Sequence, residues 1–124
     1  MLDCSALTGP TIFEVAKWYL GLFVPNFDIE SGNTRFGIIT FATSVETHFR
    51  LDKYSSVAAL QTAIRSLRYR GGQTNTAGAL RYVRTEMLTP QRGDRSDVPN
   101  VIIFTYATSD DPSAVQVSRA CSEV

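Results

Sequence analysis

The stretch RFGIITFAT at residues 35–43 constrains the fold most, because it is apolar on both faces of an extended strand. A strand of this kind lies inside a sheet that is covered on both sides. A second apolar run, VPNVIIFT at residues 98–105, predicts a buried parallel strand. Together the two runs indicate a sheet with a further layer on each face.

The segments around these runs predict helices and one edge strand. Residues 45–51 alternate, with Val45, Thr47, Phe49 and Leu51 on one face and His48 on the solvent face, which predicts an antiparallel hairpin with residues 35–43. Residues 55–67 and 75–88 have helical spacing, and Asp111 and Pro112 open a last helix that runs to residue 124. Residues 10–24 form a further amphipathic pattern, with apolar side chains at Ile12, Val15, Ala16, Tyr19, Leu20 and Phe23.

The order helix, strand, strand, helix, helix, strand, helix predicts an α/β fold with helices on both faces of the sheet. At 124 residues the chain has the length of one domain. Its 12 acidic and 12 basic residues balance, so no nucleic-acid partner is expected. No apolar run approaches the roughly 18 to 20 residues that span a bilayer, so no membrane insertion is expected, and no signal peptide is visible.

The glycine-rich segment YRGGQTNTAGAL, residues 69–80, raises the question of a phosphate site. A P-loop requires a lysine after its last glycine and follows a strand. This segment has no lysine and follows a predicted helix, so nucleotide binding is not expected. Cys4 and Cys121 do not make a disulfide framework and are not spaced for a zinc site, so both are expected to be unpaired thiols.

Three oxygen-bearing side chains are candidates for a metal site. Asp3 and Ser5 directly precede the first helix, and Thr74 lies in the glycine-rich segment. Loops at the carboxyl ends of strands meet in one crevice of an open α/β sheet, so these residues can converge. A carboxylate with hydroxyls suits Mg²⁺ that is held partly by water.

The chain resembles the von Willebrand factor type A domain family, in particular the domains of collagens and matrilins. The resemblance rests on four ordered blocks, LDCSALTGPTIFEVAKWYL, NTRFGIITFAT, YRGGQTNTAGALRYV and VPNVIIFTYATSDDP. It implies a Rossmann-like fold with a mostly parallel sheet, one antiparallel edge strand, and a metal-ion-dependent adhesion site. That site is built from a D-x-S-x-S motif, a threonine in the glycine loop and an aspartate after the fourth strand.

Asp3, Ser5 and Thr74 match the family's motif, whereas two other positions depart from it. Leu7 stands in place of the second serine, and Tyr106 stands in place of the aspartate. One carboxylate and two hydroxyls compensate poorly for dehydration of a divalent cation, and Arg68 and Arg70 would weaken binding further if they face the crevice. We therefore expect a remnant site with no resident cofactor and at most weak Mg²⁺ binding. The alternative role for Asp3, Ser5 and Thr74 is helix-cap and turn chemistry.

The resemblance also implies missing parts, so residues 1–124 are interpreted as a single, partial domain. Only Met1 and Leu2 precede Asp3, where the family has its central first strand, and the family's last two strands are not found before Val124. Without the central strand, the strands at 34–43 and 98–105 would face a gap of unpaired backbone groups. The two strands would close up, the gap would be filled from outside, or the domain would be unstable alone.

The resemblance implies a non-catalytic, metal-independent binding module of an extracellular matrix or cell-surface protein, with protein ligands such as collagen. The alternative is a structural domain that mediates self-association in a matrix protein. An enzyme is not expected, because His48 is the single histidine and no nucleophile with a base can be assigned. The tripeptide Arg92-Gly93-Asp94 suggests adhesion, but a motif this short arises often by chance.

Overall fold

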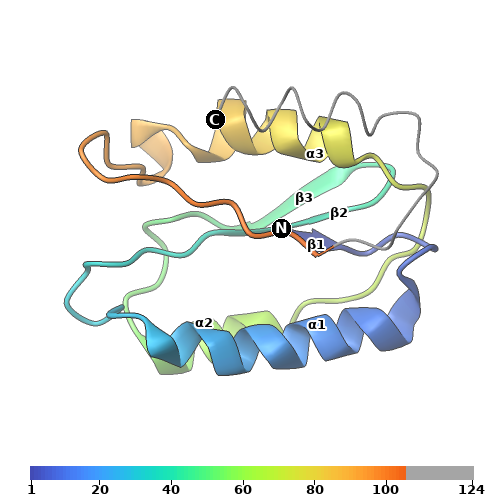
Figure 1. Cartoon of the computed structure of the whole chain (residues 1–124), viewed down its shortest axis with the longest axis horizontal. Helices are drawn as coiled ribbons and strands as arrows, with labels where there is room; N and C mark the ends of the chain where they lie inside the picture. The colour runs from blue at the N-terminus through green and yellow to red at the C-terminus, as the bar shows by residue number, and fades with distance from the viewer. Residues whose placement is uncertain (106–124) are drawn as a thin grey trace.

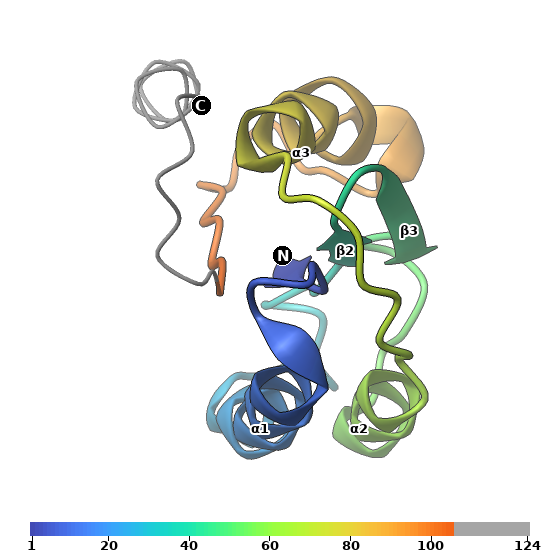
Figure 2. The ribbon, with the colours of Figure 1, turned by 90° about the vertical axis from the view of Figure 1, so that its right-hand side faces the viewer.

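The computed structural model describes residues 1–105, which form three layers (Figure 1). A small sheet lies in the middle. Helices α1 (Gly9–Phe23) and α2 (Val57–Arg65) cover one of its faces, and α3 (Thr76–Tyr82) covers the other. Figure 2 shows the same layers after a quarter turn. The predicted α/β fold with helices on both faces is confirmed; the helix predicted from Asp111 onward lies outside the described residues.

Three shorter helical segments complete the described chain. Helix α1 continues into the 3-10 helix η1 (Val24–Asn26), and α3 continues into the π-helix η2 (Val83–Met87); the 3-10 helix η3 (Pro90–Arg92) follows. Side chains cap two of the helices. At the start of α2, the Ser56 hydroxyl accepts a hydrogen bond from the Ala59 amide. At the start of α3, the side-chain Oδ1 of Asn75 accepts one from the Gly78 amide.

The sheet has the order β1-β2-β3, with β1 (Leu2–Asp3), β2 (Ile38–Phe41) and β3 (Val45–Phe49). β1 runs parallel to β2, with Leu2 opposite Thr40, and β2 runs antiparallel to β3. The predicted hairpin and the antiparallel edge strand are therefore present. The sequence overestimated the strand lengths, since the ends of both predicted strands lie in irregular chain.

A β-bulge changes the predicted faces of β3. Ile38 pairs with Phe49, whereas the next residue, Ile39, pairs with Thr47. The extra residue in β3 breaks the alternation, so Thr47 turns toward the Tyr82 hydroxyl on the α3 side while Phe49 joins the core beneath α1 and α2. The prediction that Thr47 and Phe49 share one face is wrong for this reason.

The central first strand is reduced to two residues rather than lost entirely. Three backbone hydrogen bonds join it to the segment before residue 106: the Met1 ammonium donates to the Ile103 carbonyl, and further bonds join Met1 with Thr105 and Asp3 with Thr105. The segment 98–105 forms only an isolated bridge, at Thr105. The prediction of a buried strand there is wrong, because Val101 is 82% exposed, Ile103 is 46% exposed and the segment pairs with β1 only at Thr105.

Helix α1 buries a face that overlaps only in part with the one that its periodicity predicted, since Ala16 and Leu20 pack against the core. The buried residues of α1 are Phe13 and Lys17, four residues apart. The Lys17 stem lies in the interior, and its ammonium reaches the Glu14 carboxylate at 3.0 Å. The predicted core residues Ile12, Val15 and Tyr19 are instead exposed. The helix is apolar on most of its circumference, so the 3.6-residue period could not identify the buried side.

Two hydrophobic clusters lie on opposite faces of the sheet. The larger lies between the sheet and the α1–α2 layer and includes Leu2, Phe13, Ile38, Phe49, Leu60 and Ile64. The smaller lies against α3 and includes Ile39, Phe41, Ala79, Val83 and Met87. Alternate residues of β2 supply both clusters, as expected of a strand that is buried on each side.

Candidate functional site

The residues of the predicted metal site lie at the carboxyl ends of β1 and β2, and we call this place in the fold the crevice. Asp3 ends β1 and is 1% exposed, and Ser5 follows it with no exposed surface. The Asp3 Oδ1 atom accepts the amide of Ser5 at 2.8 Å. This short loop holds the carboxylate at the end of the strand and turns the chain toward α1.

The glycine-rich segment packs against this loop. The amide of Gly71 donates to the Cys4 carbonyl at 2.9 Å, and the amide of Ala6 donates to the Gly72 carbonyl at 2.8 Å. Gly72 has φ +99, a conformation that favours glycine, and a Cβ there would lie 2.8 Å from Thr43 Oγ1. The two glycines therefore permit the close contact that brings Thr74 to the crevice.

The structure brings Asp3, Ser5 and Thr74 together. The Thr74 hydroxyl donates to the Ser5 hydroxyl over 2.8 Å, although the residues lie 69 positions apart. The convergence of the three predicted residues is thus confirmed, while their role in metal binding stays a prediction. Each hydroxyl is already engaged with the other, which gives the pair a structural function without any ion.

Leu7 and Tyr106 are the two positions that depart from the family's motif. Leu7 is 60% exposed and carries no oxygen, so it adds nothing to the ligand set. Tyr106 lies outside the described residues. Between residues 1 and 105, no group of three or more His, Cys, Asp or Glu side chains is arranged to hold a metal.

One observation does favour a cation. The second carboxylate oxygen of Asp3, Oδ2, is buried and has no hydrogen-bond partner within the described chain. A buried acceptor without a partner is unfavourable by roughly 1–3 kcal/mol. With Ser5 and Thr74, it makes a set of three hard oxygen atoms that fits Mg²⁺ in kind but has only one negative charge. Asp3, Ser5 and Thr74 would hold the ion, which would supply positive charge at the end of the sheet.

The Arg70 guanidinium is engaged by partners on the α1–α2 side of the sheet and also contacts the Cys4 thiol at 3.7 Å. Its guanidinium lies 3.2 Å from the Glu46 carboxylate and also contacts the Ser44 carbonyl and the Thr40 hydroxyl. Thr40 pairs with Leu2, so it faces the α1–α2 layer, while Asp3 is one residue further and faces the opposite side of the sheet. The sheet therefore separates the guanidinium from the Asp3 carboxylate.

Several contacts of this region were not predicted. The Tyr69 hydroxyl donates to the Ser5 carbonyl at 3.2 Å and helps to fix the loop. His48 is half-buried rather than solvent-facing, and its Nε2 lies 2.8 Å from the Thr40 hydroxyl. Burial lowers the pKa of His48, with a smaller lowering effect from Arg70, while Glu46 acts in the opposite direction. For the Tyr69 contact, the sequence signal was a tyrosine two residues before the glycine pair.

The Arg92-Gly93-Asp94 tripeptide is held within the fold. Gly93 is buried with φ +88, and its carbonyl accepts the Arg35 guanidinium at 2.9 Å. The Asp94 carboxylate accepts the Asn100 amide at 2.9 Å. These bonds give the tripeptide a structural role and leave its glycine inaccessible to a partner. Cys4 is a free, buried thiol, and Cys121 lies outside the described residues.

The chain is thus a three-layered α/β domain with a carboxylate and two hydroxyls at the carboxyl ends of its strands. A profile of the von Willebrand factor type A domain matches residues 1–123, and the chain belongs to that family. This confirms the resemblance on which the sequence interpretation rests.

Two relatives show which proteins the chain is similar to in sequence. It is 33% identical over 113 residues to von Willebrand factor A domain-containing protein 1 of Mus musculus, covering 90% of this chain and 27% of that protein. It is 30% identical over 127 residues to Matrilin-4 of Homo sapiens, covering 99% of this chain and 20% of the relative. The chain thus spans about a quarter or less of the length of these two proteins.

A solved structure supports the fold. Proximal thread matrix protein 1 from the mussel byssus, in a form with a zinc-occupied metal-ion-dependent adhesion site (MIDAS) motif, superposes with a TM-score of 0.79 at 21% identity, covering 98% of this chain and 34% of that chain. In that protein, the metal is held by its own MIDAS motif. Within the described part of our chain, no helix is long and apolar enough to span a membrane.

Proposed function

We propose that this chain is a non-catalytic protein-binding module of an extracellular matrix or cell-surface protein, and that it binds without a resident metal. Membership of the von Willebrand factor type A family and similarity to a matrilin support the general role. Protein ligands such as collagen are the proposed partners. The proposed extracellular location follows from the same relatives.

The observation that carries the metal-independent version is the hydrogen bond between Thr74 and Ser5. The two neutral ligands satisfy one another, and Asp3 supplies the only carboxylate of the set. A divalent cation would therefore gain one full charge interaction in exchange for much of its hydration shell. Leu7 exposes an apolar side chain beside the motif, which suits a protein surface better than an ion.

The test combines metal titration with ligand binding. We expect the same melting temperature in 5 mM Mg²⁺ and in EDTA, because an ion that does not bind the folded chain does not stabilise it. Binding to an immobilised fibrillar collagen should persist in EDTA. A Thr74→Val protein, which keeps the side-chain shape and loses the hydroxyl, is the matched control for damage to the loop. Stabilisation by Mg²⁺ that this substitution removes would establish the metal-dependent alternative.

Self-association is the second candidate function, and the exposed face of α1 favours it. Six large apolar side chains, each between 54% and 66% exposed, gather on this helix and the loop before it: Leu7, Ile12, Val15, Trp18, Tyr19 and Leu22. At about 100 Å² each they present roughly 600 Å², which reaches the upper end of the largest patches on monomers and approaches the roughly 800 Å² that one partner contributes to a standard interface.

A second copy of the chain is the proposed occupant of this face. Formal charge is zero, with equal numbers of acidic and basic residues, so two copies do not repel each other strongly. Sedimentation velocity should reveal a concentration-dependent dimer that Trp18→Glu abolishes. Ala58→Glu, an exposed position on α2, is the matched control and should leave the dimer intact. A strict monomer at high concentration would exclude this function.

A further inference from the structure

A polar hollow lies beside the end of β3, the edge strand of the described sheet. Its volume is about 570 Å³, within the usual range of ligand pockets. Phe49 ends β3 and pairs with Ile38, which begins β2, so the hollow and the crevice lie at opposite ends of the sheet. The residues that line the hollow come from β3, from the turn after β3 and from η3, and they include His48, Phe49, Arg50, Asp52, Lys53 and Arg92.

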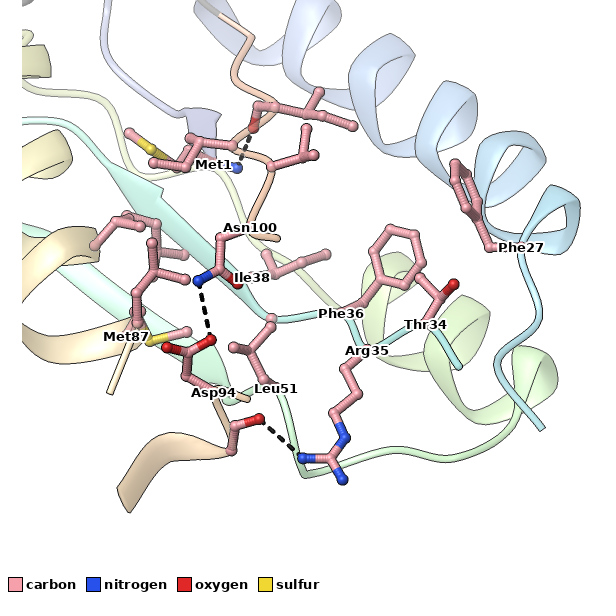
Figure 3. Close-up of a pocket in the computed structure, with 18 of the residues that line it drawn as sticks. Met1, Phe27, Thr34, Arg35, Phe36, Ile38, Leu51, Met87, Asp94 and Asn100 are labelled. Atoms are coloured by element: carbon pink, nitrogen blue, oxygen red, sulfur yellow. Dashed lines mark hydrogen bonds between the residues drawn. The ribbon is translucent and has the colours of Figure 1, made fainter. Parts of the chain in front are cut away.

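The close approach of Gly93 to Asp52 builds this hollow. Gly93 has φ +88, and a Cβ there would lie 2.7 Å from both the Cβ and the amide nitrogen of Asp52. The Gly93 carbonyl also accepts a hydrogen bond from the Arg35 guanidinium at 2.9 Å (Figure 3). Because Arg92 directly precedes this glycine at the end of η3, the fold holds Arg92 beside the turn after β3.

Three basic residues line the hollow together with a single acidic one. A hydrogen bond of 3.3 Å from the Lys53 amide to the Arg50 carbonyl closes the turn, so both basic residues of the turn lie close to Arg92. Within residues 1–105, none of these three side chains forms a salt bridge. Asp52 is the only carboxylate of the lining, so two positive charges are left without compensation even when His48 is neutral.

The chemistry of the lining favours an anion without apolar anchors. A guanidinium binds the oxygens of an anionic group through two parallel hydrogen bonds, and Arg50 and Arg92 supply two such groups. Phe49 is the only aromatic side chain of the lining and is 4% exposed, so the hollow offers no open apolar pocket to the anchor residue of a protein partner. Several linked anionic groups also bind better than one, because each contact after the first is intramolecular.

We propose that Arg50, Lys53 and Arg92 form a binding site for a segment of a sulfated polysaccharide. Sulfate groups would accept hydrogen bonds from the three basic side chains, and Arg92 would take part through its charge rather than through the Arg-Gly-Asp tripeptide as an adhesion motif. The site is separate from the crevice and from the exposed face of α1. Its failure would therefore leave collagen binding and self-association untouched, and their failure would leave this site untouched.

The direct test titrates a heparin-derived hexasaccharide into the chain by isothermal calorimetry. We expect saturable, one-to-one binding that weakens by about tenfold between roughly 50 and 300 mM NaCl, since salt screens exposed charges. The double variant Arg50→Gln, Lys53→Gln should bind about tenfold more weakly, because two ionic contacts are lost. The double variant Arg65→Gln, Arg68→Gln has the same net charge, changes two exposed positions outside the hollow and should bind like the unchanged chain.

Three further titrations decide which anion the hollow recognises. The hexasaccharide without its sulfate groups and inorganic sulfate should each bind at least about tenfold more weakly than the sulfated hexasaccharide. Hexaglutamate that binds as tightly as the sulfated sugar would overturn the proposal in favour of an acidic peptide. Inorganic sulfate that binds as tightly would reduce the site to a single-anion site. An equal loss of affinity in the two double variants would show attraction by net charge alone, and absence of binding would overturn the proposal entirely.

Discussion

At the scale of single residues, Gly72 controls how closely the glycine-rich segment approaches the end of β2. Its φ of +99 is unfavourable for other residues, and an added Cβ would lie 2.8 Å from the Thr43 hydroxyl. We expect Gly72→Ala to lower the free energy of unfolding by about 1–3 kcal/mol. Chemical denaturation followed by tryptophan fluorescence would measure it.

Gly21→Ala is the matched control for that substitution. Gly21 lies inside α1 at a negative φ, and a Cβ there meets nothing within 4 Å. Alanine favours a helix interior over glycine, so this change should raise stability by about 0.5–1 kcal/mol. A loss of stability in both variants would contradict the assignment of strain to the Gly72 conformation.

Asp3 gives a prediction that separates a charged site from a structural one. Its Oδ1 atom accepts a hydrogen bond from the Ser5 amide, while its Oδ2 atom is buried without a hydrogen-bond partner in the described chain. Asp3→Asn retains the first acceptor and removes the buried charge. We expect stability in EDTA to stay within about 1 kcal/mol of the unchanged chain. A larger loss that appears only when Mg²⁺ is present would show that the carboxylate holds an ion.

The predicted site residues are those for which a local motif exists. Asp3 and Ser5 lie two positions apart, and Thr74 follows a glycine pair, so their types and spacing were enough to suggest convergence. Tyr69 and Arg70 could not be assigned in the same way. Each acts through a contact across at least 26 positions of sequence, and the direction of each side chain depends on which face of the sheet its neighbours occupy.

At the scale of elements, helix caps were more predictable than helix faces. Ser56 and Asn75 cap α2 and α3 through local bonds that the sequence alone specifies. The buried face of α1 depends instead on what packs against it. Because the helix is apolar on most sides, burial of Phe13 and Lys17 was decided by the sheet and by α2, not by the period of its own sequence.

The β2–β3 pair predicts a dependence of stability on pH. The His48 ring accepts or donates one hydrogen bond with Thr40, and burial lowers its pKa below the ordinary value of 6.5. The unfolded chain therefore binds a proton before the folded chain does. This contribution is fully present above pH 6.5 and is lost as pH falls through the lowered folded pKa.

Urea denaturation at pH 7.5, 6.5 and 5.5 would measure this loss. His48→Gln keeps a polar side chain that cannot titrate, so its stability should fall less over the same range. The Met1 amine, the Glu46 carboxylate and the Arg70 guanidinium are common to both proteins, and their contributions cancel to first order in the difference. Identical pH profiles for the two proteins would contradict the role assigned to His48.

At the scale of the whole molecule, the sequence predicted the layers correctly and the extent of the sheet incorrectly. Apolar runs such as residues 35–43 require cover on both faces, and α1, α2 and α3 supply it (Figure 2). The run at residues 98–105 is also largely apolar, but it forms only a bridge at Thr105. A strand needs a partner along its length, and β1 pairs only over Leu2 and Asp3. Composition therefore predicted burial, while pairing determined where a strand forms.

The open state of that segment can be tested by comparing two apolar positions. Val101 is 82% exposed, whereas Ile39 is 2% exposed and packs in the cluster against α3. Val101→Lys should change the free energy of unfolding by less than about 0.5 kcal/mol. Ile39→Ala should lower it by about 2–5 kcal/mol, because it opens a cavity between the sheet and α3. If Val101→Lys proved as damaging as Ile39→Ala, residues 98–105 would be buried in solution.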